Sequence, residues 1–202
     1  MLDGSRSARS TFAVAVAASI LLSPVIVIAH PETGAVGGFV SGVLHPLTGV
    51  DHVVAMFAVG LWGAFLGAPA MFALPIVFPI VMAFGGALGI AGVPLPGIET
   101  AIACSGIVLG SMVATGARPP IWIAAVIVGV FAIFHGYAHG VEMPHVANPL
   151  TYAIGFVLAT GMLHLAGIAF GLLTRWNSGR IAVRLGGGVI CVIGFGFLLR
   201  LI

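Results

Sequence analysis

The chain alternates between long apolar stretches and short breaks rich in polar residues, proline and glycine. Six stretches are each long enough to cross roughly 30 Å of hydrocarbon as a helix; they cover about residues 48–67, 70–92, 97–116, 121–140, 150–174 and 181–201. Residues 34–44 are apolar but too short to span, which is typical of a re-entrant or interfacial helix. The pattern predicts an all-α membrane protein, a six-transmembrane-helix bundle with a short re-entrant or interfacial N-terminal helix.

The first 29 residues have the pattern of a cleavable secretory signal peptide. Two arginines precede an apolar core, and Val27-Ile28-Ala29 is an acceptable cleavage site; an uncleaved first helix is the alternative. The chain is therefore expected to comprise a signal peptide, 1–29, and a six-helix membrane domain, 30–202. Cleavage would leave His30 at the N-terminus, where its amine and imidazole either chelate a metal together or belong to a solvated tail.

Composition narrows the functional classes. Hydrophobic residues make up 60% of the chain and charged residues only 6%, with a net charge of +2. The arginines are scattered and form no basic patch, so no nucleic-acid partner is expected. The sequence leaves no room for a soluble catalytic domain and contains no GxxxxGK[ST] loop for ATP. Any transport must then be passive, driven by an ion gradient, or powered by another subunit, and no prosthetic group is predicted.

A first group of polar residues lies between the short apolar stretch and the first long one. His45, Asp51 and His52 fall within eight residues of an otherwise apolar region, and ionisable residues within a membrane usually mark a functional site. Proline should end a helix at His45, and Thr48 should begin the next with Asp51 in a capping box. Asp51 is thus either a helix cap or a metal ligand. Met56, one turn beyond His52, either packs or binds metal.

A second group closes the fourth long stretch. His135 and His139 are four residues apart, so their rings should share one face of a helix, and Glu142 follows three residues later. A carboxylate at the C-terminal end of a helix opposes the helix dipole unless a cation compensates. Imidazole and carboxylate together are ligands that suit divalent transition metals. These three residues are therefore candidate metal ligands, together with His45, Asp51 and His52.

Two further residues are less certain ligands. Glu99 begins the third long stretch, where it either stabilises the positive end of a helix dipole or binds metal. His164 lies well inside the fifth, as a neutral imidazole bonded to a backbone carbonyl or as a deeper ligand or proton-relay group. The positive-inside rule places the arginine-containing loops in the cytoplasm. Both polar groups and Glu99 then fall near the periplasmic face, which predicts capture outside, a deeper station at His164 and exit inside.

At these residues the chain resembles the HupE/UreJ family of bacterial nickel or cobalt permeases. The resemblance extends from the signal peptide to the last helix, and its specific segments are 45–52, 58–62, 95–99 and 134–142. The His-x5-Asp-His spacing also resembles the His-x4-Asp-His signature of the wider nickel/cobalt transporter group, with one more spacer residue. The resemblance implies a multi-pass carrier of the bacterial inner membrane, and cleavage of the signal peptide would leave the mature N-terminus in the periplasm. It implies that the membrane domain, residues 30–202, imports Ni²⁺ that supplies hydrogenase or urease maturation. The side chains themselves would also suit Co²⁺ or Zn²⁺ as the transported ion.

Other functions remain open on the sequence alone. A membrane-embedded zinc hydrolase needs three ligands and an activated water, for which His135, His139 and Asp51 are candidates. A rhomboid-like serine protease would use Ser105, although no GxSxG element surrounds it. A metal sensor without transport is a further alternative, and a homo-oligomer is compatible with each. Because imidazoles must lose their protons to bind metal, uptake by a permease should weaken below about pH 6.

Overall fold

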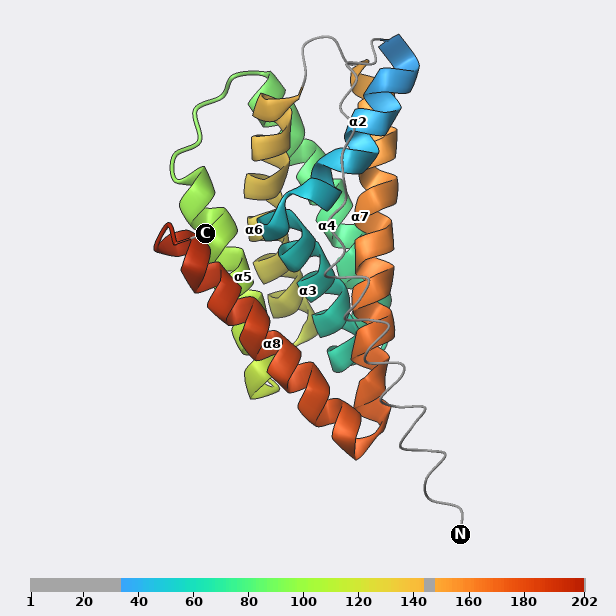
Figure 1. The fold of residues 1–202 in the computed structure, drawn as a ribbon, viewed down its shortest axis with the longest axis vertical. Coiled ribbons are helices and arrows are strands. Elements are labelled where there is room, and N and C mark those ends of the chain that lie inside the picture. The colour runs from blue at the N-terminus through green and yellow to red at the C-terminus, as the bar shows by residue number, and fades with distance from the viewer. Residues whose placement is uncertain (1–33, 144–147, 202) are drawn as a thin grey trace. The chain divides into compact units, whose positions relative to one another are not determined.

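The computed structural model describes residues 34–143 and 148–201. In this part of the chain all regular secondary structure is helical, and turns or loops join the helices. It contains seven α-helices and one short 3-10 helix: α2 (Gly34–Thr48), α3 (Val50–Leu66), α4 (Ala70–Ile90), α5 (Ile98–Thr115), α6 (Ile121–Glu142), α7 (Pro149–Gly171), η1 (Leu172–Arg175) and α8 (Asn177–Leu198) (Figure 1). The predicted signal peptide and His30 lie outside the described residues.

Several helices are long and apolar enough to cross a membrane. Five qualify individually, namely α4, α5, α6, α8 and α7 continued by η1. The helices α2 and α3 qualify only together, and they meet at a bend of 81°. The chain is thus an all-α, multi-pass membrane protein. The sixth crossing predicted from the sequence depends on whether this bent pair counts as one broken span.

The break between α2 and α3 differs from the prediction. The helix does not stop at His45; it continues through Pro46 to Thr48, whose hydroxyl donates to the His45 carbonyl at 3.1 Å. Proline in a last turn costs one backbone hydrogen bond, which this side-chain bond partly offsets. The chain instead breaks at Gly49, the N-cap of α3, which makes no side-chain cap. The predicted capping box is therefore wrong, and the Asp51 carboxylate is left for another partner.

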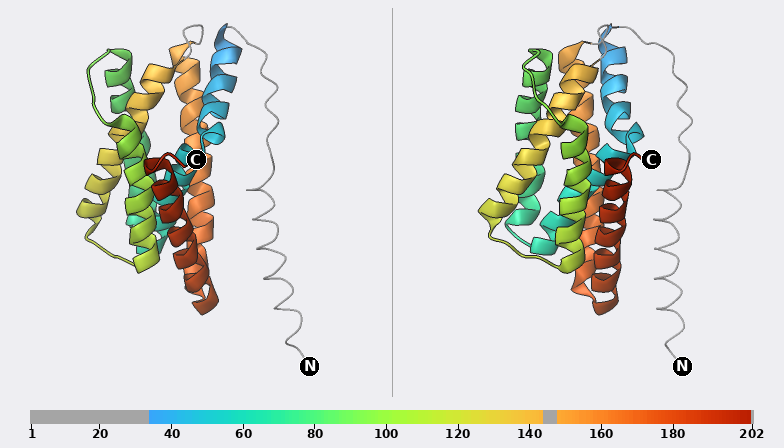
Figure 2. Two further views of the ribbon diagram at one scale, coloured as in Figure 1. Left: turned by 60° about the vertical axis from the view of Figure 1, so that its left-hand side comes forward. Right: turned by 90° about the vertical axis from the view of Figure 1, so that its left-hand side faces the viewer.

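The helices pack in three main pairs (Figures 1 and 2). The bent pair α2–α3 lies along α7, α4 packs on α6, and α5 packs on α8. Glycines permit these close approaches: a Cβ at Gly60 of α3 would strike the His164 carbonyl of α7, and one at Gly136 of α6 would strike the Met82 carbonyl of α4. Small residues at interfaces let membrane helices approach closely. α3 is the central helix, because it also contacts α4, α5 and α8.

The last helix begins earlier than predicted. α8 starts at Asn177, so most of the expected polar loop before residue 181 is helical. Arginine is a good helix former, and two arginines near the start of α8 have hydrogen-bond partners, one local and one on α5. Arg180 bonds the Asn177 side chain at 3.0 Å, and Arg184 bonds the backbone carbonyl of Ala114 at 2.7 Å. The arginines of this segment fit a polar loop as well as a helix end that donates hydrogen bonds to the neighbouring helix. The sequence therefore did not decide between the two.

Candidate metal centre

The bend at Gly49 brings the two ends of the first motif together. His45 lies in the last turn of α2 and His52 in the first turn of α3, and their ring centroids are 6.4 Å apart. A continuous helix would separate residues seven positions apart by roughly 10 Å along its axis. The 81° turn instead points both rings toward the C-terminal end of α6.

His139 of α6 is the centre of the resulting group of imidazoles. Its ring centroid lies 4.8 Å from that of His45 and 4.4 Å from that of His52. His135, one turn earlier on α6, lies 5.3 Å from His52. The four rings therefore form a continuous series, in the order His45, His139, His52 and His135. We call these four histidines with Asp51 and Glu142 the histidine cluster.

The outermost part of the cluster contains a carboxylate. The Glu142 Oε2 atom lies 3.3 Å from His45 Nε2, and one donor atom from each of His45, His139 and Glu142 can be chosen so that all lie within 4.8 Å of one another. Two imidazoles and one carboxylate in such a group can hold a divalent transition metal. A bound cation, or a protonated His45, also compensates the conflict between Glu142 and the dipole of α6.

Asp51 orients His52 rather than capping α3. Its Oδ1 atom lies 2.8 Å from His52 Nδ1, so Nδ1–H donates to the carboxylate. A carboxylate on one imidazole nitrogen fixes the tautomer and raises the basicity of the other, as is common for metal-binding histidines. His52 Nε2 is buried and, within the described part of the chain, lacks a hydrogen-bond partner. The arrangement thus presents Nε2 as a lone-pair donor.

Unpartnered buried nitrogens occur in three of the four histidines of the cluster, His52, His135 and His139, within the described residues. His135 donates from Nδ1 to the Phe131 carbonyl at 2.9 Å, and its Nε2 is free. In His139 neither ring nitrogen has a partner among residues 34–143 and 148–201. Buried polar atoms are nearly always hydrogen-bonded, so a group of exceptions requires an explanation such as an ion or water. The histidine cluster has the donors that a metal ion would satisfy.

Exposure is high at one end of the cluster and low in the other three rings, with His139 at 5%. The side chain of Glu142 is 53% exposed and that of His45 is 27% exposed, whereas that of His52 is only 9% exposed. His135, the last ring of the series, is fully buried. The cluster therefore opens to the surface at Glu142 and His45 and leads inward to His135.

Aromatic side chains of α7 pack beside the histidine cluster, and neither was among the residues predicted from the sequence to form the site. Phe156 of α7 packs on His139 with ring centroids 4.2 Å apart, and Tyr152 lies 6.0 Å from His45. The Tyr152 hydroxyl is buried and has no partner in the part of the fold that is described. The sequence did contain a pattern that could have indicated them. Tyr152, Phe156, Thr160 and His164 follow at intervals of four and so lie along one face of α7.

The less certain candidates lie apart from the histidine cluster. Glu99 is 91% exposed and its Oε2 atom is 3.9 Å from an Arg200 nitrogen. Met56 is fully buried, and its sulfur accepts a hydrogen bond from Thr160 at 3.4 Å. His164 of α7 is buried as well, and the Phe78 ring contacts both it and His135.

Ser105, the candidate nucleophile of the protease alternative, is fully buried. Its hydroxyl donates to the carbonyl of Ile102 within α5 at 2.6 Å. A serine nucleophile needs a base within hydrogen-bond reach. The bond that the structure shows for Ser105 is that of a hydroxyl used inside its own helix.

Comparison with known proteins identifies the family to which the chain belongs. The model of the HupE / UreJ protein family matches residues 17–197. The chain is 42% identical over 172 residues to Protein HupE of Rhizobium leguminosarum bv. viciae, covering 85% of this chain and 90% of that protein. No solved structure matches. The two sequence matches span nearly all of the helical domain and include both histidine motifs, so the chain belongs to the HupE/UreJ family.

Proposed function

We propose that this chain is a secondary transporter that imports Ni²⁺, or Co²⁺, across the bacterial inner membrane. The observation that carries the proposal is the convergence of four imidazoles and two carboxylates from α2, α3 and α6, with their buried nitrogens unpartnered within the described chain. Membership of the HupE/UreJ family, which is linked to nickel and cobalt transport, supports the same function. The metal is the cargo and not a resident cofactor.

The first step is capture at the exposed end of the cluster. Glu142 contributes a negative charge at the surface, and His45 and His139 supply imidazole nitrogens within 4.8 Å of its carboxylate. A hydrated divalent ion can exchange water for these ligands one at a time. A negatively charged entrance raises the local concentration of cations before they bind.

The second step moves the ion inward by ligand exchange. His139 lies between His45 and His52, and His52 lies between His139 and His135. Each transfer therefore needs only a few ångströms of motion and keeps at least one imidazole on the metal. Asp51 assists by holding the His52 ring with Nε2 available.

Transport explains the arrangement better than hydrolysis does. A zinc hydrolase needs three ligands and one water in a single site. Here further free imidazoles continue into the bundle beyond the first three ligands, as a path requires. We accordingly propose that the chain is not an enzyme.

Orientation completes the proposal. Arg118, Arg175, Arg180 and Arg184 lie at one end of the helices, and the positive-inside rule assigns that end to the cytoplasm. The exposed end of the cluster is then periplasmic, as is the mature N-terminus, so that the transport is inward. The imported metal would supply hydrogenase or urease maturation.

Uptake of ⁶³Ni²⁺ at nanomolar concentration, in cells that lack other nickel carriers, tests this function. Wild type should accumulate nickel, and Asp51→Ala, His52→Ala and His139→Ala should lower accumulation to background at matched expression. Arg180→Gln is the control, because it removes a charge at the exposed start of α8.

The proposal fails for nickel if wild-type cells accumulate no more than the empty strain. The same assay with cobalt and zinc then separates another cargo from a protein that does not transport. Full uptake by the three cluster variants would instead place the metal path elsewhere in the bundle.

A further inference from the structure

One buried imidazole is not part of the histidine cluster. His164 of α7 is 2% exposed, and its Nε2 atom has no hydrogen-bond partner in the described ranges 34–143 and 148–201. It lies far from the exposed end of the cluster, which opens at Glu142 and His45. A buried, unpartnered nitrogen within an apolar helix is costly, so its retention suggests a use.

The ring of His164 is held in place through a backbone carbonyl of α4. That carbonyl belongs to Pro75, which has no helical partner because residue 79, four positions later, is also proline and has no N–H. A freed carbonyl in a membrane helix must be satisfied by a neighbour. The Pro75 carbonyl lies where it can accept from the imidazole of His164, and Nε2 is the unpartnered nitrogen in the described ranges.

Phe78 separates His164 from the histidine cluster. Its ring meets His135 edge-on at 5.8 Å and His164 edge-on at 5.4 Å, and the side chain is fully buried. No imidazole-to-imidazole contact therefore joins His135 to His164 in this conformation. Among residues 34–143 and 148–201, the unpartnered ring nitrogens belong to His52, His135 and His139 and, without a direct ring contact to these, to His164.

A further candidate donor atom, the Met56 sulfur, lies on α3, which packs against α7. Met56 follows His52 by one turn of α3, and its sulfur faces Thr160, one turn before His164 on α7. Gly60, the next turn of α3, packs directly on the His164 backbone carbonyl. The Met56 thioether thus lies on α3 about one turn from the point where α3 packs on the backbone of His164.

We propose that His164 Nε2 is an inner metal-binding station, distinct from the histidine cluster, with the Met56 sulfur as an auxiliary donor. One imidazole and a thioether bind a divalent ion weakly, and the ion keeps water in its other positions. Weak binding suits a station that must also release the ion toward the cytoplasm. This inference rests on the proposed transport function and adds a second site to it.

The decisive variant is His164→Gln. A glutamine amide can still donate to the Pro75 carbonyl, but the imidazole nitrogen is lost. In purified protein, equilibrium dialysis with Co²⁺ should show a tight class of sites unchanged within about twofold, and a weaker class that disappears. Uptake of ⁶³Ni²⁺ should fall by at least about tenfold. Met56→Leu should lower uptake by a few fold, with Met162→Leu, 66% exposed on α7, as the matched control.

Each other outcome overturns the inference. Unchanged uptake by His164→Gln shows that the ion does not need this residue. Loss of the tight sites together with the weak ones makes His164 a structural support of the cluster. Reduced uptake with the weak class intact makes His164 a proton-relay or packing residue and not a ligand. Absence of uptake by wild type is a different result, because it removes the proposed function itself.

Discussion

Two regions at opposite ends of α3 use their ionisable side chains in opposite ways. The histidine cluster lies at the N-terminal end of α3, where buried ring nitrogens have no partner within the described chain. At the other end, the Trp62 indole donates to the Ala117 carbonyl, and Arg184 of α8 donates to the carbonyls of Ala114 and Thr115 at 2.7 and 3.3 Å. The Ala114 and Thr115 carbonyls lie in the last turn of α5, where no helical N–H follows to bond them, and Ala117 follows in the turn after it.

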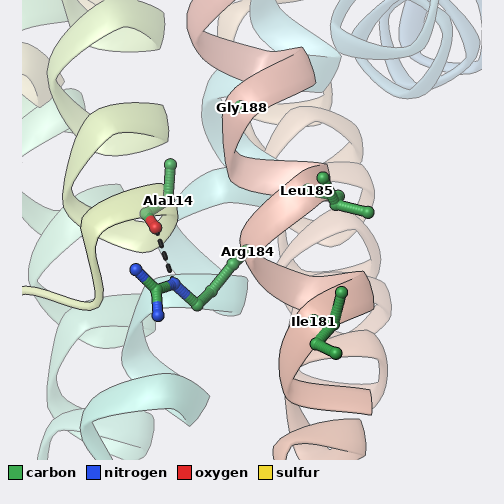
Figure 3. A pocket seen from close by; sticks show the side chains of 5 residues that line it. All are labelled: Ala114, Ile181, Arg184, Leu185 and Gly188. Carbon is green, nitrogen blue, oxygen red and sulfur yellow. Dashed lines mark hydrogen bonds between the residues drawn. The ribbon is translucent and has the colours of Figure 1, made fainter. Parts of the chain in front are cut away.

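The pocket beside Arg184 emphasises the contrast (Figure 3). It has a volume of about 440 Å³ and is lined by Ala114, Ile181, Arg184, Leu185 and Gly188. Its walls are mostly apolar, and its single charged side chain turns toward the backbone of α5. Space alone therefore does not identify a metal site. The buried nitrogens without partners among the described residues lie instead toward the other end of α3, in the histidine cluster.

The comparison predicts that removing a free donor costs binding and not stability. His139→Leu should weaken Ni²⁺ binding by at least about 100-fold, since even residues that only orient a ligand cost about 10–100-fold. Replacing an unpartnered buried imidazole by an apolar side chain of similar size should leave the free energy of unfolding unchanged or slightly raised. Equilibrium dialysis and thermal unfolding of the purified protein measure the two quantities.

A clear drop in melting temperature for His139→Leu would break the comparison, because it would show that the ring nitrogens have structural partners. Phe156→Leu is a useful control for the packing around His139. It changes the apolar contact while leaving every candidate ligand in place.

Asp51 tests whether a side chain that only orients a candidate ligand also affects metal binding. Asp51→Asn keeps the size of the side chain and can still accept from His52 Nδ1, but it loses the charge. We expect Ni²⁺ affinity to fall by about 10–100-fold, as for other partners of metal-binding histidines. Equal affinity of Asp51→Asn and wild type, measured by the same dialysis, would contradict the orienting role that the 2.8 Å bond indicates.

The sequence predicted the helices well and the break between α2 and α3 poorly. Apolar stretches of membrane length have few alternatives to helix, so four of the long helices, α4 to α7, begin within about one residue of their predicted starts. Proline at position 46 suggested a helix end, yet the break occurs at Gly49. The reason is tertiary: α2 and α3 each pack on α7 through glycine contacts, and that packing decides where the chain turns.

Much of the histidine cluster also followed from sequence, because i, i+4 spacing places His135 and His139 on one face of α6. What spacing could not provide was the choice of partner for each side chain. Asp51 bonds His52, Glu142 bonds His45, and Glu99 lies near Arg200. Those choices depend on how separate helices meet, which no local pattern contains.

Arg184 tests the opposite expectation, that losing a partnered side chain lowers stability and leaves nickel binding unchanged. Its expected effect is the smallest of those predicted. Arg184→Met keeps an unbranched side chain on α8 but leaves the last carbonyls of α5 without their charged donor. Stability should fall by about 1 kcal/mol, since the side chain is exposed and water replaces part of the interaction. Nickel binding should not change, because the cluster lies at the other end of α3. If Arg184→Met weakened binding as much as Asp51→Asn does, the two ends of the bundle would be coupled, and the division between structural and cargo-binding side chains would not hold.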